Sequence, residues 1–207
     1  MEEQRIERAL GELGQSVPEG STGKFATLLA ELDRWNRRVN LTAIRDFNGM
    51  LTSHLLDSLA ARQLLHGNTV LDVGTGAGFP GLPLAIAEPD RHFTLLDSNN
   101  KKIMFVQHAA GLLGLGNVVA VKGRAQDYAP GHRFDTVIAR ALAALPRLVE
   151  IAGHLVREDG VFVALKGRYP AEELEQLDDA PWTHEVMELV VPGLEPGSRH
   201  AVLLRRA

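Results

Sequence analysis

The sequence predicts an α/β protein in which a mostly parallel, seven-stranded sheet follows a cap of helices. From residue 67 onward, short apolar runs alternate with helical segments, and this alternation is typical of βαβ units. Over residues 2–65, apolar residues recur instead at three- and four-residue spacing, which indicates helices. We therefore expect an N-terminal helical cap over residues 1–66 and a sheet domain over residues 67–207, packed as one compact unit.

The cap contains three apolar runs, which begin near Ile6, Phe25 and Met50. Turn signals at residues 17–20 and 40–48 separate these runs. We therefore expect at least three helices before the sheet begins.

The sheet region contains seven strand candidates. Five lie at residues 69–73, 92–96, 117–121, 135–139 and 161–166. Helices are expected between them at residues 82–87, 101–113 and 145–155, with an acidic helix near 171–178. The last two strands, 184–191 and 199–205, are joined by a Pro- and Gly-rich segment that is too short for a crossover helix. This final pair should be an antiparallel hairpin, which leaves the last strand reversed.

Composition is typical of a soluble globular protein and excludes several chemistries. Of the 207 residues, 45% are hydrophobic and 23% are charged. The absence of cysteine excludes disulfides, thiolate nucleophiles and Cys-ligated metals. The N-terminus lacks the apolar run of a secretory signal, and no window approaches the roughly 18 apolar residues that span a bilayer. We expect a cytoplasmic protein with no membrane partner, and a monomer by default.

Charge is distributed unevenly along the chain. The formal net charge is −4, which by itself argues weakly against a nucleic-acid partner. However, residues 169–198 contain eight acids and no Lys or Arg, so the remainder has 22 basic against 18 acidic residues. Either a basic face turned toward a polyanion or a solvated mixed surface is compatible with this distribution.

A glycine-rich loop follows the first strand and precedes a helix. It has the pattern D-x-G-x-G-x-G, formed by Asp72, Gly74, Gly76 and Gly78. A dinucleotide site would place a third glycine where this chain has Phe79. A carboxylate at Asp72 is unfavourable beside a pyrophosphate and favourable beside the ammonium group of S-adenosylmethionine. The loop therefore predicts an S-adenosylmethionine site, with a dinucleotide site or a purely structural turn as the alternatives.

Later strand ends complete the predicted donor site. Asp97, which is 19 residues beyond Gly78, ends the second strand and can accept both ribose hydroxyls. The alternative role for Asp97 is the N-cap of the next helix. After the third strand, backbone groups of Ala125 and Gln126 could read an adenine edge. Arg140 follows the fourth strand, where the methyl group would leave the donor.

Residues and motifs that the chain lacks exclude some classes of methyl acceptor. Methylation of pyrimidine C5 generally needs a cysteine nucleophile. Exocyclic-amine methyltransferases usually have Asn/Asp-Pro-Pro-aromatic after the fourth strand, where this chain has residues Ala139 to Leu142. A ring nitrogen, an oxygen or a sulfur remains as the acceptor.

Several motifs together resemble one family. In order they are W-N-x-x-x-N-L-T at residues 35–42, H-x-x-D-S at 54–58, the loop at 72–81, L-D-S at 96–98, Arg140-Ala141 and Lys166-Gly167. This set resembles the bacterial small-subunit (16S) ribosomal RNA guanine-N7 methyltransferases over nearly the whole chain, most weakly over residues 1–24 and 170–197. The first two motifs matter most, because methyltransferases in general lack them.

The resemblance implies a class I (Rossmann-like) methyltransferase fold with donor contacts at Gly74, Phe79, Ala125, Gln126 and Arg140. Two positions depart from the family pattern. Ala77 stands where proline is frequent and should loosen the loop slightly. Gln126 stands where glutamate is frequent, so any contact to the adenosine there would be neutral.

Guanine N7 is an acceptor that needs no general base. It has an exposed lone pair and no proton, so it can attack the donor methyl directly, and catalysis can come mostly from alignment. We name no catalytic base, and we interpret Arg140 as a positioning group.

Other polar residues are candidates for binding ribosomal RNA or its assembly particle. Phosphate contacts are predicted at four cations near strand ends, with a solvated surface charge as the alternative for each. Asn40 is predicted near the target base. The four cations are Lys101, Arg124, Lys166 and Arg199. His54 and Asp57 could bond each other or pack the cap against the donor loop, and without a third ligand we predict no metal site.

Three other functions remain open from the sequence alone. The chain could methylate a small metabolite or a protein, or it could be a donor-binding regulator without activity. A dehydrogenase is the least favoured, because the glycine loop departs from the dinucleotide pattern.

Overall fold

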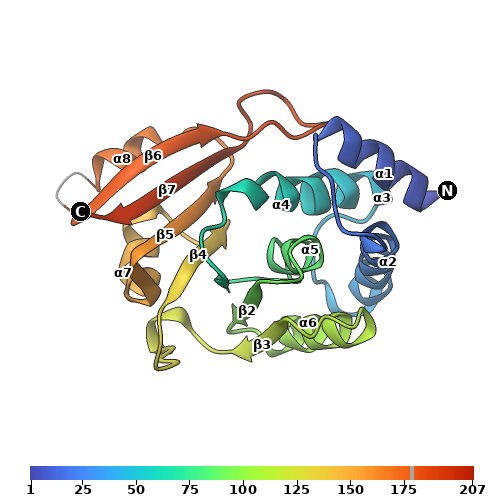
Figure 1. Ribbon diagram of the computed structural model, residues 1–207, viewed down its shortest axis with the longest axis horizontal. Coiled ribbons are helices and arrows are strands. Elements are labelled where there is room, and N and C mark those ends of the chain that lie inside the picture. Colours follow the sequence, from blue (N-terminus) through green and yellow to red (C-terminus); the bar gives the residue numbers. More distant parts are fainter. Residues whose placement is uncertain (178–179) are drawn as a thin grey trace.

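The computed structural model describes residues 1–177 and 180–207, and its centre is a seven-stranded sheet (Figure 1). The strand order is β3-β2-β1-β4-β5-β7-β6. β7 runs antiparallel to both of its neighbours, whereas the pairs among β1 to β5 are parallel. The mostly parallel sheet with a reversed last strand is therefore confirmed. The strands are β1 (Thr69–Val73), β2 (His92–Asp97), β3 (Val118–Lys122), β4 (Phe134–Arg140), β5 (Val156–Lys166), β6 (Trp182–Glu188) and β7 (His200–Arg206).

The cap consists of two longer helices and a chain of short ones. α1 (Glu2–Glu12) and α2 (Ser21–Val39) are separated by a turn, as expected. The third apolar run is not one regular helix. It contains α3 (Phe47–Met50), a π-helical turn η1 (Leu51–Leu56), α4 (Asp57–Ala60) and a 3₁₀ turn η2 (Arg62–Leu64). π-Turns are rare and occur frequently at functional sites.

The remaining helices connect the strands. They are α5 (Gly81–Ala87), α6 (Asn100–Leu112), η3 (Ala125–Asp127), α7 (Leu145–Ala152), η4 (Gly153–Leu155) and α8 (Ala171–Glu175). The expected helix at 145–155 is therefore α7 continued by a 3₁₀ turn. The acidic helix expected near 171–178 is shorter than predicted, and its last predicted residue, Asp178, lies outside the described residues, as does Asp179.

Two strands differ from the sequence prediction by more than one residue at an end. β5 begins at Val156, five residues earlier than predicted, because Val156 pairs with Phe134 of β4 before a shift in register. β6 spans Trp182–Glu188 and not 184–191. Apolar alternation does not mark the start of β6, since the exposed Thr183 still pairs with Arg205 of β7.

One hydrophobic core joins the cap to the sheet. Ile6 and Phe25 of the cap belong to the same buried cluster as Val70 and Val163 of the sheet. α5 lies between these layers (Figure 1), and all seven of its residues are buried. A helix that is apolar on all sides is expected to be buried in this way. The division at residue 66 stays a prediction about folding units.

Among the described residues, no helix combines the length and the apolar character that a membrane crossing requires.

Gly81, the first residue of α5, should not tolerate a side chain. An added Cβ would lie 2.7 Å from Leu95 Cγ and 2.8 Å from Asp72 Oδ2. Overpacking of this kind costs about 1–3 kcal/mol, so Gly81→Ala should lower the free energy of unfolding by that amount in urea denaturation. Gly111→Ala in α6 is the control, because nothing lies within 4 Å of its added Cβ. The control should stabilise by about 0.5–1 kcal/mol. Equal effects of the two substitutions would contradict this packing.

Candidate active site

The glycine-rich loop joins β1 to α5 through three left-handed residues. Gly74, Gly76 and Gly78 have φ values of +70°, +61° and +85°. A Cβ at Gly78 would also collide with Leu82 at 2.3 Å, whereas the nearest atoms to a Cβ at Gly76 are 4.0 Å away. The loop is therefore packed tightly against α5 at Gly78 and remains open in front of Gly76. Glycine there lets a ligand approach the backbone closely.

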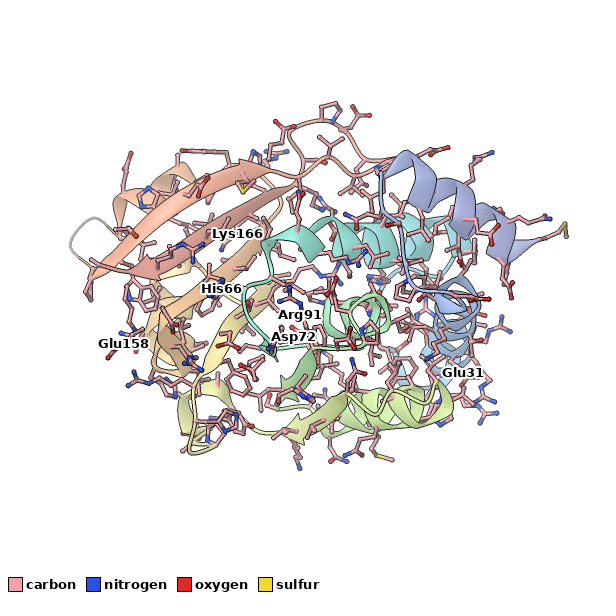
Figure 2. The ribbon with its side chains drawn as sticks, viewed as in Figure 1. Glu31, His66, Asp72, Arg91, Glu158 and Lys166 are labelled. Carbon is pink, nitrogen blue, oxygen red and sulfur yellow. The ribbon has the colours of Figure 1, made fainter. Side chains whose placement is uncertain are left out.

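Asp72 anchors this loop from inside the protein. Its side chain is fully buried, and Oδ2 accepts hydrogen bonds from Thr75 Oγ1 at 2.6 Å and from the Gly81 amide at 2.8 Å. Figure 2 shows Asp72 in the interior of the molecule, near α5. Burial raises the pKa of Asp72 to about 6. Oδ1 is buried and has no partner among the described residues. A direct contact of Asp72 with a donor stays a prediction.

Asp97, at the end of β2, holds the loop from the other side. Its Oδ2 accepts the Gly76 amide at 2.9 Å, and its Oδ1 accepts the Asn99 amide at 2.8 Å. The N-cap of α6 is Asn99, whose side chain accepts the Lys101 amide. The alternative in which Asp97 caps this helix is therefore wrong.

A cavity of about 410 Å³, the donor cavity, opens beside this loop. It brings together five of the predicted site residues: Gly74, Asp97, Arg124, Ala125 and Gln126. The other predicted donor-binding residues do not line it: Asp72, Gly76, Gly78, Phe79 and Arg140. Lys102 does line it, with Nζ 3.9 Å from Asp97 Oδ2, whereas the predicted Lys101 is exposed on the first turn of α6. Neighbouring residues of a helix point in different directions, and sequence proximity to the strand end did not reveal which lysine faces the cavity.

A second cavity of about 460 Å³, the acceptor cavity, lies between the cap and the ends of β4, β5 and β7. Ala141 lines both cavities, so they meet immediately after β4. Ala141 has φ +51°, a left-handed conformation that costs a non-glycine residue of order 1–3 kcal/mol. The ionisable residues that line the acceptor cavity are His54, Asp57, Arg140, Lys166, Arg199 and His200.

Asp57 connects two arginines across the acceptor cavity. Its Oδ2 lies 2.8 Å from Arg140 Nη1, and its Oδ1 lies 2.8 Å from Arg199 Nε. The Asp57 side chain is only 7% exposed. Arg140 also donates to the carbonyl oxygen of Ser53, within the π-helical turn, at 2.9 Å. One carboxylate therefore holds together the cap, the end of β4 and the start of β7.

His54 packs the cap against the glycine-rich loop and does not bond Asp57. Its ring stacks on Phe79 with centroids 4.9 Å apart, and its Nε2 lies 2.9 Å from Thr42 Oγ1. Burial and, secondarily, the nearby Arg140 charge lower the pKa of His54 to about 4. His54 is therefore neutral near pH 7.

The predicted RNA-contact residues occupy different environments. Lys166 Nζ is 2.7 Å from Glu173 Oε2, and Arg199 pairs with Asp57, so both are held by carboxylates. Arg124 is exposed at the donor cavity. Asn40 ends α2 in a left-handed conformation with φ +50°, and its side chain accepts from Arg45 at 3.2 Å. RNA contacts at these residues stay predictions.

Comparison with known proteins identifies close relatives. The family model for rRNA small subunit methyltransferase G matches residues 21–202. Relatives described as ribosomal RNA small subunit methyltransferase G include those of Idiomarina loihiensis (46% identity, 92% of each chain) and Laribacter hongkongensis (43% identity, 97% of each chain). That of Pasteurella multocida is 42% identical over 98% of this chain and 96% of its own.

Solved structures share the fold at low sequence identity. The glycopeptide N-methyltransferase MtfA in complex with (S)-adenosyl-L-methionine aligns with TM-score 0.60 and 13% identity, over 73% of this chain and 87% of its own. The DhpI–SAH complex aligns with TM-score 0.59 and 19% identity, over 90% of this chain and 97% of its own. These likenesses confirm the predicted methyltransferase-type α/β fold.

Removal of the carboxylate from the two-arginine bridge at Asp57 should be strongly destabilising. Asp57→Asn would remove a buried charge and leave Arg140 and Arg199 without their carboxylate, so it should lower the free energy of unfolding by about 3 kcal/mol. Asp33→Asn, which breaks the more exposed Asp33–Arg37 pair, should cost at most about 1 kcal/mol. Chemical denaturation of both variants measures the difference. A cost for Asp57→Asn as small as that of the control would show that the bridge adds little.

Proposed function

This chain belongs to the family of small-subunit ribosomal RNA methyltransferases, and on that premise we propose that it methylates guanine N7 of that RNA with S-adenosylmethionine as donor. The observation that carries the proposal is the junction of two cavities at Ala141. One cavity has the acid and backbone groups suited to an adenosine, and the other has an excess of cations.

The residues of the donor cavity fit S-adenosylmethionine. Asp97 lies at the strand end where a carboxylate can accept ribose hydroxyls, and backbone groups of Ala125 and Gln126 are placed for an adenine edge. The space before Gly76 admits a ligand against the backbone. The unpartnered Oδ1 of Asp72 is a buried acceptor beneath the loop, suited to a cationic group. When bound, the donor supplies a methyl group activated by its sulfonium charge.

The acceptor cavity fits a nucleotide of RNA. Arg140, Lys166 and Arg199 line it, against the single lining carboxylate Asp57. Positive charge concentrated at a cavity attracts a polyanion and orients its phosphates. Arg140 and Ala141 lie next to the donor cavity, so a base entering here reaches the point where the two ligands meet.

The surroundings of the cavity agree with an acceptor that carries no proton. Guanine N7 has a lone pair and needs no base to remove a proton. His54, with its pKa near 4 and its Nε2 close to Thr42, is poorly suited to act as a base at neutral pH. Asp57 is occupied by two arginines. In this proposal Arg140 positions the ligands and transfers no proton.

We also propose that the protein acts where small subunits are assembled, in the cytoplasm, and as a monomer.

The direct test is methyl transfer to unmodified small-subunit RNA, both free and as an assembly particle. With labelled donor, label should be found on guanine N7 after nucleoside analysis. Because no group has to lose a proton, kcat should stay flat between about pH 6 and 9. Label on an exocyclic amine or ribose, or a rate that rises tenfold per pH unit, would refute the proposed chemistry. Transfer only to small heterocycles would favour a metabolite methyltransferase.

The raised pKa of Asp72 predicts a pH dependence of donor binding. Below about pH 6 the buried carboxyl is protonated and cannot pair with an ammonium group. Donor affinity should therefore rise about tenfold from pH 5 to pH 7, as the carboxylate forms. Asp72→Asn keeps an acceptor for the Gly81 amide and should flatten this rise. Calorimetric titration measures both proteins, and an unchanged slope in the variant would assign the pH dependence to another group.

A further inference from the structure

A third cavity lies on the cap, separate from the donor and acceptor cavities. Its volume is about 330 Å³, and its lining is Arg34, Trp35, Arg38 and Val39 of α2 with His108 of α6. α2 and α6 lie side by side at one end of the molecule (Figure 1). Figure 2 shows Glu31, which belongs to this region, on the opposite side of the view from Lys166 of the acceptor cavity. We call this space the cap cavity.

The Trp35 ring forms one wall of the cap cavity, and two neighbouring rings hold it in place. The Trp35 ring packs edge-on against Phe105, with centroids 5.6 Å apart. It also lies tilted against the His108 ring, with centroids 5.2 Å apart. Because both neighbours hold the indole, it offers a fixed aromatic surface at little cost in conformational entropy. Such surfaces stack on unpaired nucleobases.

The cations around the cap cavity are partly fixed and partly free to bind. Glu31 Oε2 lies 2.5 Å from Arg34 Nη2 and 2.8 Å from His108 Nε2, which fixes both side chains. Arg38 is exposed, and no ion pair or side-chain hydrogen bond involves it within residues 1–177 and 180–207. A guanidinium beside an aromatic ring suits a phosphate attached to a stacked base.

The helix that lines the cap cavity leads directly into the loop that lines the acceptor cavity. α2 ends at Val39, and the loop that follows contains Thr42, which contacts His54, and Ile44, which lines the acceptor cavity. The Asn36 side chain clamps this loop by bonding both the amide and the carbonyl of Thr42. An occupant of the cap cavity therefore contacts the helix that positions one wall of the acceptor cavity.

We propose that the cap cavity binds an unpaired nucleotide of the RNA substrate, remote from the methylated base, with its base on Trp35 and its phosphate on Arg38. This inference rests on the proposed function, since it assumes an RNA substrate. The arginines alone would attract an acidic peptide as well as RNA. The aromatic ring of Trp35 favours RNA, because an acidic peptide has no base that could stack on it.

Trp35 fluorescence tests the site without any catalytic readout. The chain has two tryptophans, so Trp182→Phe leaves Trp35 as the only one. With the donor cavity saturated by S-adenosylhomocysteine, uridine and guanosine 5′-monophosphates should quench this emission saturably. Inorganic phosphate should not. Arg38→Ala should weaken nucleotide binding about tenfold, since it removes a hydrogen bond to a charged group. If Trp182→Phe fails to fold, the difference between wild type and Trp35→Phe gives the same signal.

Arg37→Ala is the matched control. Arg37 is the adjacent exposed arginine of α2, pairs with Asp33 and does not line the cavity, so its removal should change nucleotide affinity less than twofold. Equal losses in the two variants would indicate diffuse charge attraction and overturn the site. So would an absence of saturable quenching, or equal quenching by polyglutamate, which would instead favour a protein partner.

Methyl transfer then separates this inference from the proposed function. If the chain methylates ribosomal RNA, Arg38→Ala should raise KM for RNA and leave kcat unchanged. If no ribosomal preparation is methylated, the proposed function fails, while quenching of Trp35 by nucleotides still reports whether the cap cavity binds them.

Discussion

The buried carboxylate of Asp57 is the interaction on which the rest of the site depends. It is the only lining acid of the acceptor cavity among the described residues. It binds Arg140, the last residue of β4, and Arg199, the residue before β7. Two guanidinium groups at one cavity would repel each other without it. By neutralising part of their charge, Asp57 holds both side chains in place and still leaves the cavity positive. Removing ions from water is costly, so this geometry favours a defined arrangement more than it favours stability.

The sequence was most informative where function depends on local backbone geometry. The glycines of residues 74–78 and the acid at Asp97 each follow a strand, and parallel strands bring their carboxyl ends to one edge of the sheet. The reversed β7 followed from the short connection that precedes it, which has no room for a crossover helix. Contacts between distant segments were not predictable. The sequence gives no sign that Asp57 bonds Arg199, which is 142 residues away, in place of the nearby His54. Nor did it show that Lys102, and not Lys101, faces the donor cavity, or that a π-turn interrupts the cap.

Asp72 has a structural role that the sequence did not predict. A carboxylate before a glycine-rich loop was interpreted as a ligand contact, yet its Oδ2 is used to bond Thr75 and Gly81. Both roles fit, because a carboxylate has two oxygens and only one is occupied. The pattern of residues could identify the acid, but only the packing of α5 shows that it is buried completely.

The position of β7 has a consequence for synthesis of the protein on the ribosome. β7 is inserted between β5 and β6, so β6 has no strand to pair with until the segment at residues 200–206 has emerged. Arg199 directly precedes that strand and completes the pair of arginines around Asp57. A chain that stops short of Arg199 contains the glycine-rich loop and the cap helices, yet it lacks one wall of the acceptor cavity. The lining of the cavity is therefore complete only after this late segment has been translated.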